Sequence, residues 1–239
     1  MCIRDRPNTV HPLADRSDIP IAHVTHVNAL LWDTGRAPTV VIEHGVPDPG
    51  PRYTGELARL GVVVNEPVRR GSRSVPVTLP RFAAVAPLDV FGMSTQMLPD
   101  ALGLGDALAV GGDLPPARLH AELARRRVYL HPLRWTSLGL SLLEAMHLGM
   151  PVVVLGMTEA FRAVPPEAGA VSADIDELVL AARMLVADPE EAARRGAIAR
   201  AFALERFGLR RFLDDWDTLL ADTVSSSPSH LGRAERTVG

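Results

Sequence analysis

The chain has 239 residues, of which 47% are hydrophobic, and this is enough for one large domain or two smaller ones. The formal charge of −3 at pH 7 predicts no general attraction to nucleic acid or to anionic lipid. The single cysteine, Cys2, excludes an internal disulfide and a zinc site built from several cysteines.

The basic residues and the apolar runs indicate which ligands the protein could bind and whether it spans a membrane. All 25 basic residues are arginine, whose forked and permanently charged side chain suits phosphate binding. The longest apolar run, residues 148–157, is too short to span a bilayer and contains Pro151. The charged residues 1–6 do not resemble a secretory signal. We therefore expect a cytoplasmic protein with no transmembrane segment, with the inner membrane surface as an alternative location.

The first part of the chain has few regular patterns. Residues 1–17 are interpreted as a ragged or foreign start, and short strands are predicted over 19–25 and 40–43. Residues 44–51 contain three prolines and two glycines in eight positions, which predicts an irregular crossing between two domains. A short helix is expected over 53–60.

From Gly61 onward, strands and helices alternate regularly, apart from a loop-rich stretch over 93–107. This order predicts a mostly parallel sheet with right-handed crossovers. Ligands of such sheets bind beyond the carboxyl ends of the strands, which places residues 65–71, 134–140 and 156–159 around one crevice. The expected strands are 62–65, 88–92, 128–130, 152–155 and 170–172, and the expected helices are 79–86, 115–126, 141–148, 176–187, 189–207 and 209–224, with a helical turn over 158–163.

The unit over residues 128–155 is the most informative. Two short aliphatic strands flank a loop of small residues, 136–139, that leads directly into a helix. Glu144 is an unexpected carboxylate in that otherwise apolar helix. It either accepts hydrogen bonds from sugar hydroxyls or is an exposed acid that complements the helix dipole.

Residues 130–154 resemble the C-terminal donor-binding domain of the group 1 (family four) glycosyltransferases, which have a GT-B fold. The resemblance rests on Gly-Leu-Ser-Leu-Leu-Glu-Ala-Met at 139–146 and Gly-Met-Pro-Val-Val at 149–153. It extends over about residues 40–222 and is closest to an actinobacterial-type subgroup with Arg-Trp-Thr-Ser-Leu-Gly-Leu. Further matches are Val62 to Asn65, Arg70, Gly71, Leu88 to Gly92, Asp188, Pro189, Gly196, Arg200 and Phe207.

The resemblance implies an α/β protein of GT-B type with a complete Rossmann-like C-terminal domain, 51–208, and a remnant of an N-terminal acceptor domain, 18–50. A closing helix, 209–224, would pack back on the N-terminal part, and a tail, 225–239, is expected to be disordered. The residues before the crossing are too few for a whole acceptor domain, so we expect a chain truncated at its N-terminus. The closing helix would then expose apolar side chains: Phe212, Leu213, Trp216, Leu219 and Leu220.

The activity that the resemblance implies is transfer of a sugar, with retention of configuration, from a nucleoside-diphosphate sugar to a glycan, lipid or small-molecule acceptor. It implies no metal or other cofactor, and a truncated chain would have little or no activity alone. The alternative is a non-catalytic nucleotide-sugar-binding module or partner subunit. A dinucleotide-binding dehydrogenase is disfavoured because no Gly-x-Gly-x-x-Gly follows the first strand. No catalytic residue is assigned.

The family's donor-binding residues carry over one at a time. Glu144 stands at the second glutamate of the family's Glu-x7-Glu motif and is implied to bind the nucleotide ribose. Thr136 stands where the family has the first glutamate of that motif. Arg70 is implied to contact the diphosphate, and Asn65 replaces the family's neighbouring arginine. Arg134 is one candidate substitute for that missing cation, and Arg69 is the other.

Two loops complete the expected donor site. The backbone amides of Ser137, Leu138, Gly139 and Leu140 precede a helix and are expected to hold phosphate charge. Thr158 and Glu159 stand where the family has a glycine-rich loop near the sugar, and Glu159 either faces the donor or is a solvated surface acid.

Other polar residues have weaker claims to function. The acids at 214, 215 and 217 are better interpreted as solvated than as a metal site. His131 either contacts a phosphate or base, or is a packed histidine. His23, His26 and His44 do not have metal-ligand spacing, although His44 follows a strand and is a candidate for approaching an acceptor.

Overall fold

A computed structural model describes residues 9–69 and 77–226. Its main feature is a six-stranded sheet with the order β10-β9-β8-β5-β6-β7, in which every neighbouring pair is parallel. This confirms the expected α/β fold with a parallel sheet. The strands are β5 (Leu57–Val63), β6 (Leu88–Phe91), β7 (Leu108–Gly112), β8 (Arg126–His131), β9 (Val152–Leu155) and β10 (Gly169–Ser172).

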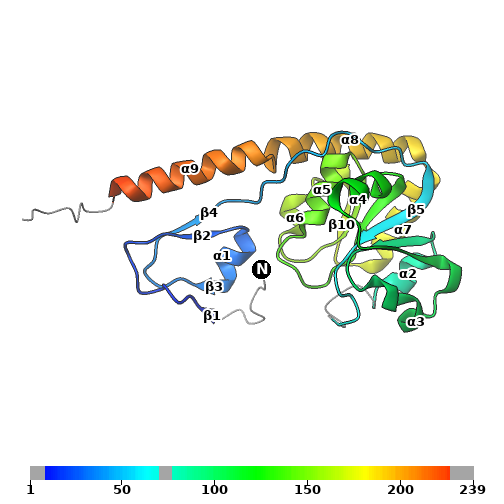
Figure 1. Cartoon of the computed structure of the whole chain (residues 1–239), viewed down its shortest axis with the longest axis horizontal. Helices are drawn as coiled ribbons and strands as arrows, with labels where there is room; N and C mark the ends of the chain where they lie inside the picture. The colour runs from blue at the N-terminus through cyan, green and yellow to red at the C-terminus, as the bar shows by residue number, and fades with distance from the viewer. Residues whose placement is uncertain (1–8, 70–76, 227–239) are drawn as a thin grey trace, which may run out of the picture.

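Helices cover both faces of this sheet, and each face has its own apolar core (Figure 1). Along β9, Val152 and Val154 enter one core and Val153 enters the other, because successive side chains of a strand point to opposite faces. The helices of the first core are α4 (Pro116–Leu123), α5 (Leu140–Leu148), α6 (Ala160–Ala163) and most of α8 (Pro189–Arg206); those of the second are α2 (Leu79–Ala83), α3 (Leu98–Leu102) and α7 (Ile175–Ala187).

The turn after α5, at Gly149, is held close to α8. Gly149 ends α5 with a φ of +90°, a conformation that favours glycine. A Cβ atom at Gly196 of α8 would lie 2.0 Å from the carbonyl oxygen of Gly149, so no larger residue fits there. This contact fixes α5 against α8 and positions the loop that precedes α5.

The N-terminal part consists of two parallel two-stranded pairs with one short helix (Figure 1). β1 (Thr9–Val10) pairs with β3 (Trp32–Asp33), and β2 (Ile21–His23) pairs with β4 (Thr39–Val41). Helix α1 (His26–Leu31) begins after Thr25, whose hydroxyl oxygen accepts a hydrogen bond of 3.0 Å from the amide of Asn28.

An irregular segment, 42–56, and a long helix connect this part to the sheet. The segment forms only one isolated bridge, between Val46 and Gly208, as its prolines and glycines predict. Helix α9 (Leu209–Ser226) follows α8 directly and extends over β4 and β2 (Figure 1). Within the part of the chain that the structure describes, no helix is long and apolar enough to cross a membrane.

Several expected elements differ from the structure. Residues 53–60 do not form a helix; they lead into β5, a central strand in which Leu60 and Val62 are fully buried. The region 93–107 contains α3 and two 3-10 turns, and β7 follows it where no strand was expected. Helix α9 continues through Ser225 and Ser226, so these two residues are helical and not part of a disordered tail. Residues 1–8 and 227–239 lie outside the described residues.

Candidate functional site

Two loops meet at the carboxyl end of the sheet. Residues 132–139 connect β8 to α5, and residues 156–159 connect β9 to α6. The hydroxyl oxygen of Thr158 lies 2.9 Å from the carbonyl oxygen of Ser137 and also within hydrogen-bonding distance of that of Thr136. The structure therefore brings together two of the three segments expected around one crevice, 134–140 and 156–159, whereas residues 65–69 do not line it. They enclose a small pocket lined by His131, Leu133, Thr136, Ser137, Leu138, Gly139, Leu142, Leu155, Met157, Thr158 and Ala160.

Thr158 has an unusual backbone conformation at this junction. Its φ of +52° lies in the left-handed region, which costs a threonine about 1–3 kcal/mol. The hydrogen bonds of its side chain to the neighbouring loop compensate for part of this cost. The amide of Glu159 adds a longer hydrogen bond, of 3.4 Å, to the carbonyl oxygen of Ser137.

Gly139 ends the first loop because no side chain fits there. A Cβ atom at this position would lie 2.4 Å from Cε1 of His131, whose ring lies under the loop. Gly139 then has an extended conformation, and α5 begins at Leu140 with its first amides next to the pocket. Leu140 itself is exposed, whereas Leu138 is buried.

His131 is a buried histidine with one unsatisfied nitrogen. Burial lowers its pKa to about 4, so the ring is neutral at pH 7. Its Nδ1 atom lies 3.2 Å from the hydroxyl of Tyr129, which donates a 2.9 Å hydrogen bond to Oγ of Ser141. No partner for Nε2 exists among the described residues, although this nitrogen is buried at the pocket. His131 is thus a packed histidine, and its Nε2 atom has no hydrogen-bond partner among the described residues.

Glu144 lies in the second turn of α5 and is about one-third exposed. The first turn of this helix contains no acidic residue, so the alternative of a helix-start acid that complements the dipole is wrong. Its Oε2 atom lies 3.7 Å from Nε2 of His120 on α4, too far for a direct hydrogen bond.

Asn65, Arg69 and Arg134, which were expected near the diphosphate, are not among the described residues that line this pocket. Asn65 is exposed at the end of β5, and its side-chain oxygen accepts a 3.0 Å hydrogen bond from the amide of Met93. Arg69 forms an ion pair with Glu66, and Arg134 is an exposed residue of the loop before α5. Arg70 lies outside the described residues.

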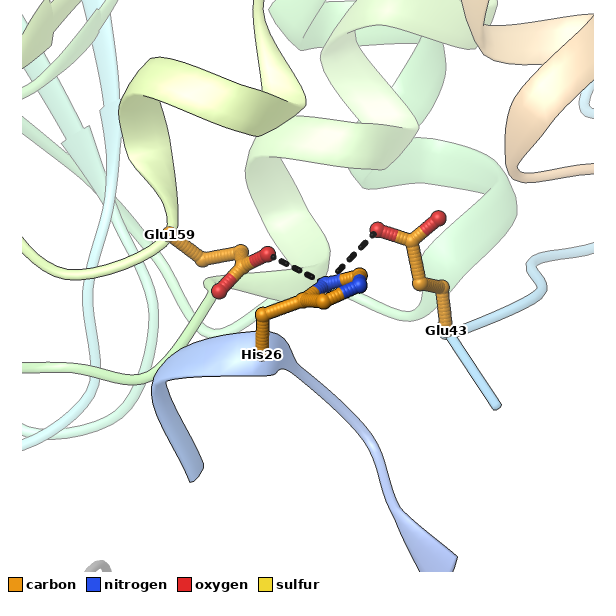
Figure 2. Close-up of side chains that lie close together, drawn as sticks. All are labelled: His26, Glu43 and Glu159. Atoms are coloured by element: carbon orange, nitrogen blue, oxygen red, sulfur yellow. Dashed lines mark hydrogen bonds and ion pairs between the residues drawn. The ribbon is translucent and has the colours of Figure 1, made fainter. Parts of the chain in front are cut away.

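Glu159 has a role that the sequence did not reveal. Its side chain is only 1% exposed, so it is not a solvated surface acid. One carboxylate oxygen lies 3.1 Å from Nδ1 of His26, and the other accepts a 2.9 Å hydrogen bond from the amide of Val27 (Figure 2). These partners belong to the N-terminal part and lie more than 130 positions away along the chain.

His26 brings a second acid, Glu43, into the same group (Figure 2). The three side chains place ligand atoms within 4.8 Å of one another, which is close enough to hold a metal ion. Arg206 already binds both oxygens of Glu43, at 2.9 and 2.5 Å, and Arg162 lies 3.2 Å from Glu159. A cation would have to displace these arginines, so we interpret the group as an ion-pair network.

The remaining polar candidates do not form a site. Asp215 pairs with Arg211 one turn earlier in α9, and Asp214 and Asp217 are exposed, which fits solvated acids. His23 is buried on β2, and burial lowers its pKa. Burial also lowers the pKa of His44.

The fold is that of the GT-B glycosyltransferases, with one Rossmann-like domain and a smaller N-terminal part. Residues 94–202, just under half of the chain, match the family model of the glycosyl transferases group 1. This matched region includes both loops of the pocket and Glu144. No curated protein sequence matches the chain.

Solved structures show the same fold at low sequence identity. Sucrose-phosphate synthase from Thermosynechococcus elongatus has a TM-score of 0.73 and 18% identity over 87% of this chain and 59% of its own. TarM of S. aureus, in complex with UDP and sugar ligands, has a TM-score of 0.70 and 16% identity over 83% of this chain and 43% of its own. HepE of Anabaena, in complex with UDP-glucose, has a TM-score of 0.67 and 17% identity over 84% of this chain and 63% of its own. The chain therefore spans less than two thirds of each of these proteins.

Proposed function

We propose that the chain is the donor-binding part of a retaining glycosyltransferase that takes its sugar from a nucleoside-diphosphate sugar. The observation that carries this proposal is the pocket at the carboxyl end of the sheet, where the first amides of α5 meet the β9–α6 loop. This is where ligands of parallel sheets bind, and helix N-termini bind phosphates. The match of residues 94–202 to a glycosyltransferase family covers both loops.

The diphosphate is assigned to the amides of Ser137, Leu138, Gly139 and Leu140. Because Tyr129 donates its hydroxyl proton to Ser141, Nδ1 of His131 carries the ring hydrogen that bonds to Tyr129, and Nε2 is a buried acceptor at the pocket. A sugar hydroxyl would then satisfy the nitrogen that lacks a partner. Arg70 is assigned to the diphosphate as a cation, with Arg134 or Arg69 as a second one, and Asn65 stands where the family has a neighbouring arginine.

Glu144 is assigned to the ribose, because a carboxylate accepts hydrogen bonds from two adjacent hydroxyls at once. Thr136, with Thr158 beside it, is assigned to the transferred sugar. As the bond to the sugar breaks, the anomeric carbon becomes positive and the departing diphosphate gains negative charge. The arginines and helix amides stabilise that charge without a metal ion.

We further propose that residues 18–50 are part of an acceptor domain, that 51–208 form the donor domain, and that α9 closes the structure. Support comes from a groove of about 400 Å³ between α9 and the N-terminal strands. Leu213, Leu220 and Val224 of α9 are 50–75% exposed, which is typical of a face that packs against further structure. On this proposal, the 239 residues alone transfer little or no sugar. The groove is lined by His11, Leu13, Ile19, Pro20, Ile21, Ala22, Trp216, Leu219, Leu220 and Thr223.

A thermal unfolding screen with UDP, GDP and ADP tests the donor site. A nucleotide at 100 times its Kd stabilises a protein by about 2.7 kcal/mol. For a chain of this size this corresponds to roughly 5–10 °C in Tm. We expect UDP to be the most effective, because HepE and TarM are solved with UDP. If none of the three nucleotides raises Tm, the proposed donor site does not exist.

Substitution of Glu144 tests its assignment to the ribose. Hydrogen bonds to a charged group contribute about 1.5–3 kcal/mol, so Glu144→Ala should weaken UDP binding about 10- to 100-fold. Calorimetric titration measures this change. Glu205→Ala, at an exposed position of α8, is the matched control and should bind UDP like the parent. Equal affinity of Glu144→Ala and the parent would rule out the ribose contact.

The second candidate function is a nucleotide-sugar-binding module without catalysis. The groove beside α9 favours it as much as it favours an incomplete enzyme, because a partner subunit could supply the covering structure. A transfer assay with labelled UDP-sugar, in the presence of candidate glycan, lipid and small-molecule acceptors, separates the two. Product formation supports the enzyme, whereas nucleotide binding without turnover in an N-terminally extended chain supports the module.

A further inference from the structure

Glu159 contacts two regions that are far apart in the sequence. Its side chain reaches the first turn of α1, where it bonds to the ring of His26 and to the amide of Val27 (Figure 2). Its backbone belongs to the β9–α6 loop, where Thr158 and Glu159 bond to the carbonyl oxygen of Ser137. One residue therefore connects the proposed donor pocket to the N-terminal part.

The hydrogen-bond pattern defines how His26 is held. Nη2 of Arg162 lies 3.5 Å from Nε2 of His26, and an arginine can only donate. Nε2 therefore accepts, and Nδ1 carries the hydrogen that is donated to Glu159. In this arrangement the ring of His26 bonds to both Glu159 and Arg162.

Charged groups from five segments of the chain surround this contact. Two carboxylates, Glu43 and Glu159, face three arginines: Arg162 of α6, Arg206 of α8 and Arg211 of α9. Arg211 donates a 2.6 Å hydrogen bond to the carbonyl oxygen of Glu43. Burial is the largest single influence on Glu43 and raises its pKa, but Arg206, His26 and Arg211 together outweigh burial, so the pKa of this acid is lowered. The network is neutralised by arginines and needs no metal ion.

Glu159 loses much of its environment if the N-terminal part moves away. A carboxylate that is 1% exposed is stable only while its hydrogen-bond partners are present, and two of the three groups that contact it, the His26 ring and the Val27 amide, come from α1. Loss of these partners would leave Glu159 with Arg162 alone. The position of the β9–α6 loop is therefore linked to the position of α1.

We propose that Glu159 is a latch that couples the donor pocket to the N-terminal part of the chain. The assignment of the pocket to a nucleotide rests on the proposed function; the coupling itself rests on the contacts of Glu159. A ligand that orders residues 134–140 also orders the β9–α6 loop and thereby holds α1. Because coupling is reciprocal, loosening α1 loosens the loops of the pocket.

Hydrogen exchange of the nucleotide-free protein tests the coupling directly, because it measures local opening. Glu159→Ala should increase exchange in residues 26–31 about tenfold or more. His26→Ala, which lies outside the pocket, should increase exchange in residues 134–140 and 156–160. Glu205→Ala should change neither segment. Exchange in the buried strands β8 and β9 reports whether each variant is folded, and Glu159→Gln, which keeps an acceptor for Val27, should have a smaller effect.

The two variants together decide the outcome. If His26→Ala leaves the pocket loops unchanged, or if Glu159→Ala leaves α1 unchanged, the latch does not exist. If an alanine substitution also increases exchange in β8 and β9, that variant is not properly folded. The corresponding glutamine variant, Glu159→Gln or His26→Gln, is then used in the same comparison. Hydrogen exchange in the variant with both Glu159→Ala and His26→Ala should be only slightly faster than in either single variant, because both substitutions remove the same contact.

A second measurement with UDP separates this inference from the proposed function. In the parent, UDP should slow exchange both in residues 134–140 and in residues 26–31. In Glu159→Ala, it should slow exchange only in residues 134–140. Protection of 26–31 that persists in this variant would overturn the latch. Absence of any protection by UDP in the parent would overturn the nucleotide assignment, while the nucleotide-free comparison would still decide the latch.

Discussion

The two parts of the molecule differ in how much of their structure they stabilise themselves. In the sheet part, β8 and β9 lie between other strands, and their side chains enter two separate cores. In the N-terminal part, the strands have two or three residues and pair only two at a time. Isolated two-stranded pairs are marginally stable in water. The N-terminal part therefore depends on contacts with α6, α8 and α9, whereas the sheet part does not depend on it to the same degree.

Matched core substitutions should show this difference most strongly. Leu130 of β8 is fully buried, and Leu130→Ala should lower the free energy of unfolding by about 2–5 kcal/mol. Ile21 of β2 borders the groove beside α9, so Ile21→Ala should cost about 2 kcal/mol or less. Urea unfolding followed by circular dichroism measures both. A larger loss for Ile21→Ala would mean that the N-terminal part contributes as much to global stability as the sheet.

Gly139 provides a test inside the sheet part. Gly139→Ala forces the ring of His131 to move, because the added Cβ atom would lie 2.4 Å from that ring. Overpacking of this kind typically costs about 1–3 kcal/mol. Thermal unfolding should show this loss, and calorimetry should show weaker UDP binding, since the amides that follow Gly139 shift. Ser141→Ala, which removes only the hydroxyl next to Tyr129, is the comparison variant and should affect UDP binding less.

The smallest effect is expected at the junction between the two parts. Arg200 binds both oxygens of Asp48 at 2.8 Å and lowers the pKa of this acid to about 2. Because Asp48 is 39% exposed, solvent screening reduces the pair to about 0.2–1 kcal/mol. A carboxylate with a lowered pKa stabilises the protein above its unfolded pKa of about 4, and this contribution is lost as the pH falls toward 2.

Asp48→Asn should therefore reduce stability slightly at pH 7 and hardly at all near pH 2. Urea titrations at several pH values measure this difference. A loss of the same size at both pH values would show that packing, and not the ion pair, accounts for the effect.

The sequence predicted the β8–α5–β9 unit well because each of its signals is local. Aliphatic runs mark the strands, and Gly149 marks the end of the helix. The first half of β5 was predicted to be helical because Leu57 and Leu60 have helical spacing. The same residues can also lie in a central strand, and only their pairing with β6 and β8 shows which structure forms. The structure also shows that Glu144 lies beyond the first turn of α5.

The contact between Glu159 and α1 could not be predicted in the same way. His26 and Glu159 are separated by 133 positions, and no motif connects them. A glutamate after a strand is an ordinary surface residue by its local pattern, and only its burial identifies it as something else. Most of the fold could thus be predicted from local periodicity. The ion-pair network between the two parts of the molecule could not, because it depends on long-range packing.

The junction of α8 and α9 has a mechanical consequence. Val46 forms its bridge with Gly208 at this point, and Gly45 lets Phe212 approach so closely that a Cβ atom would lie 2.3 Å away. From this junction, the 18 residues of α9 extend for about 27 Å at 1.5 Å per residue. A rotation of roughly 10° at Gly208 would move the far end of such a helix by about 5 Å. A small rotation at the junction therefore produces a larger displacement at the far end of α9, which lies over the N-terminal strands.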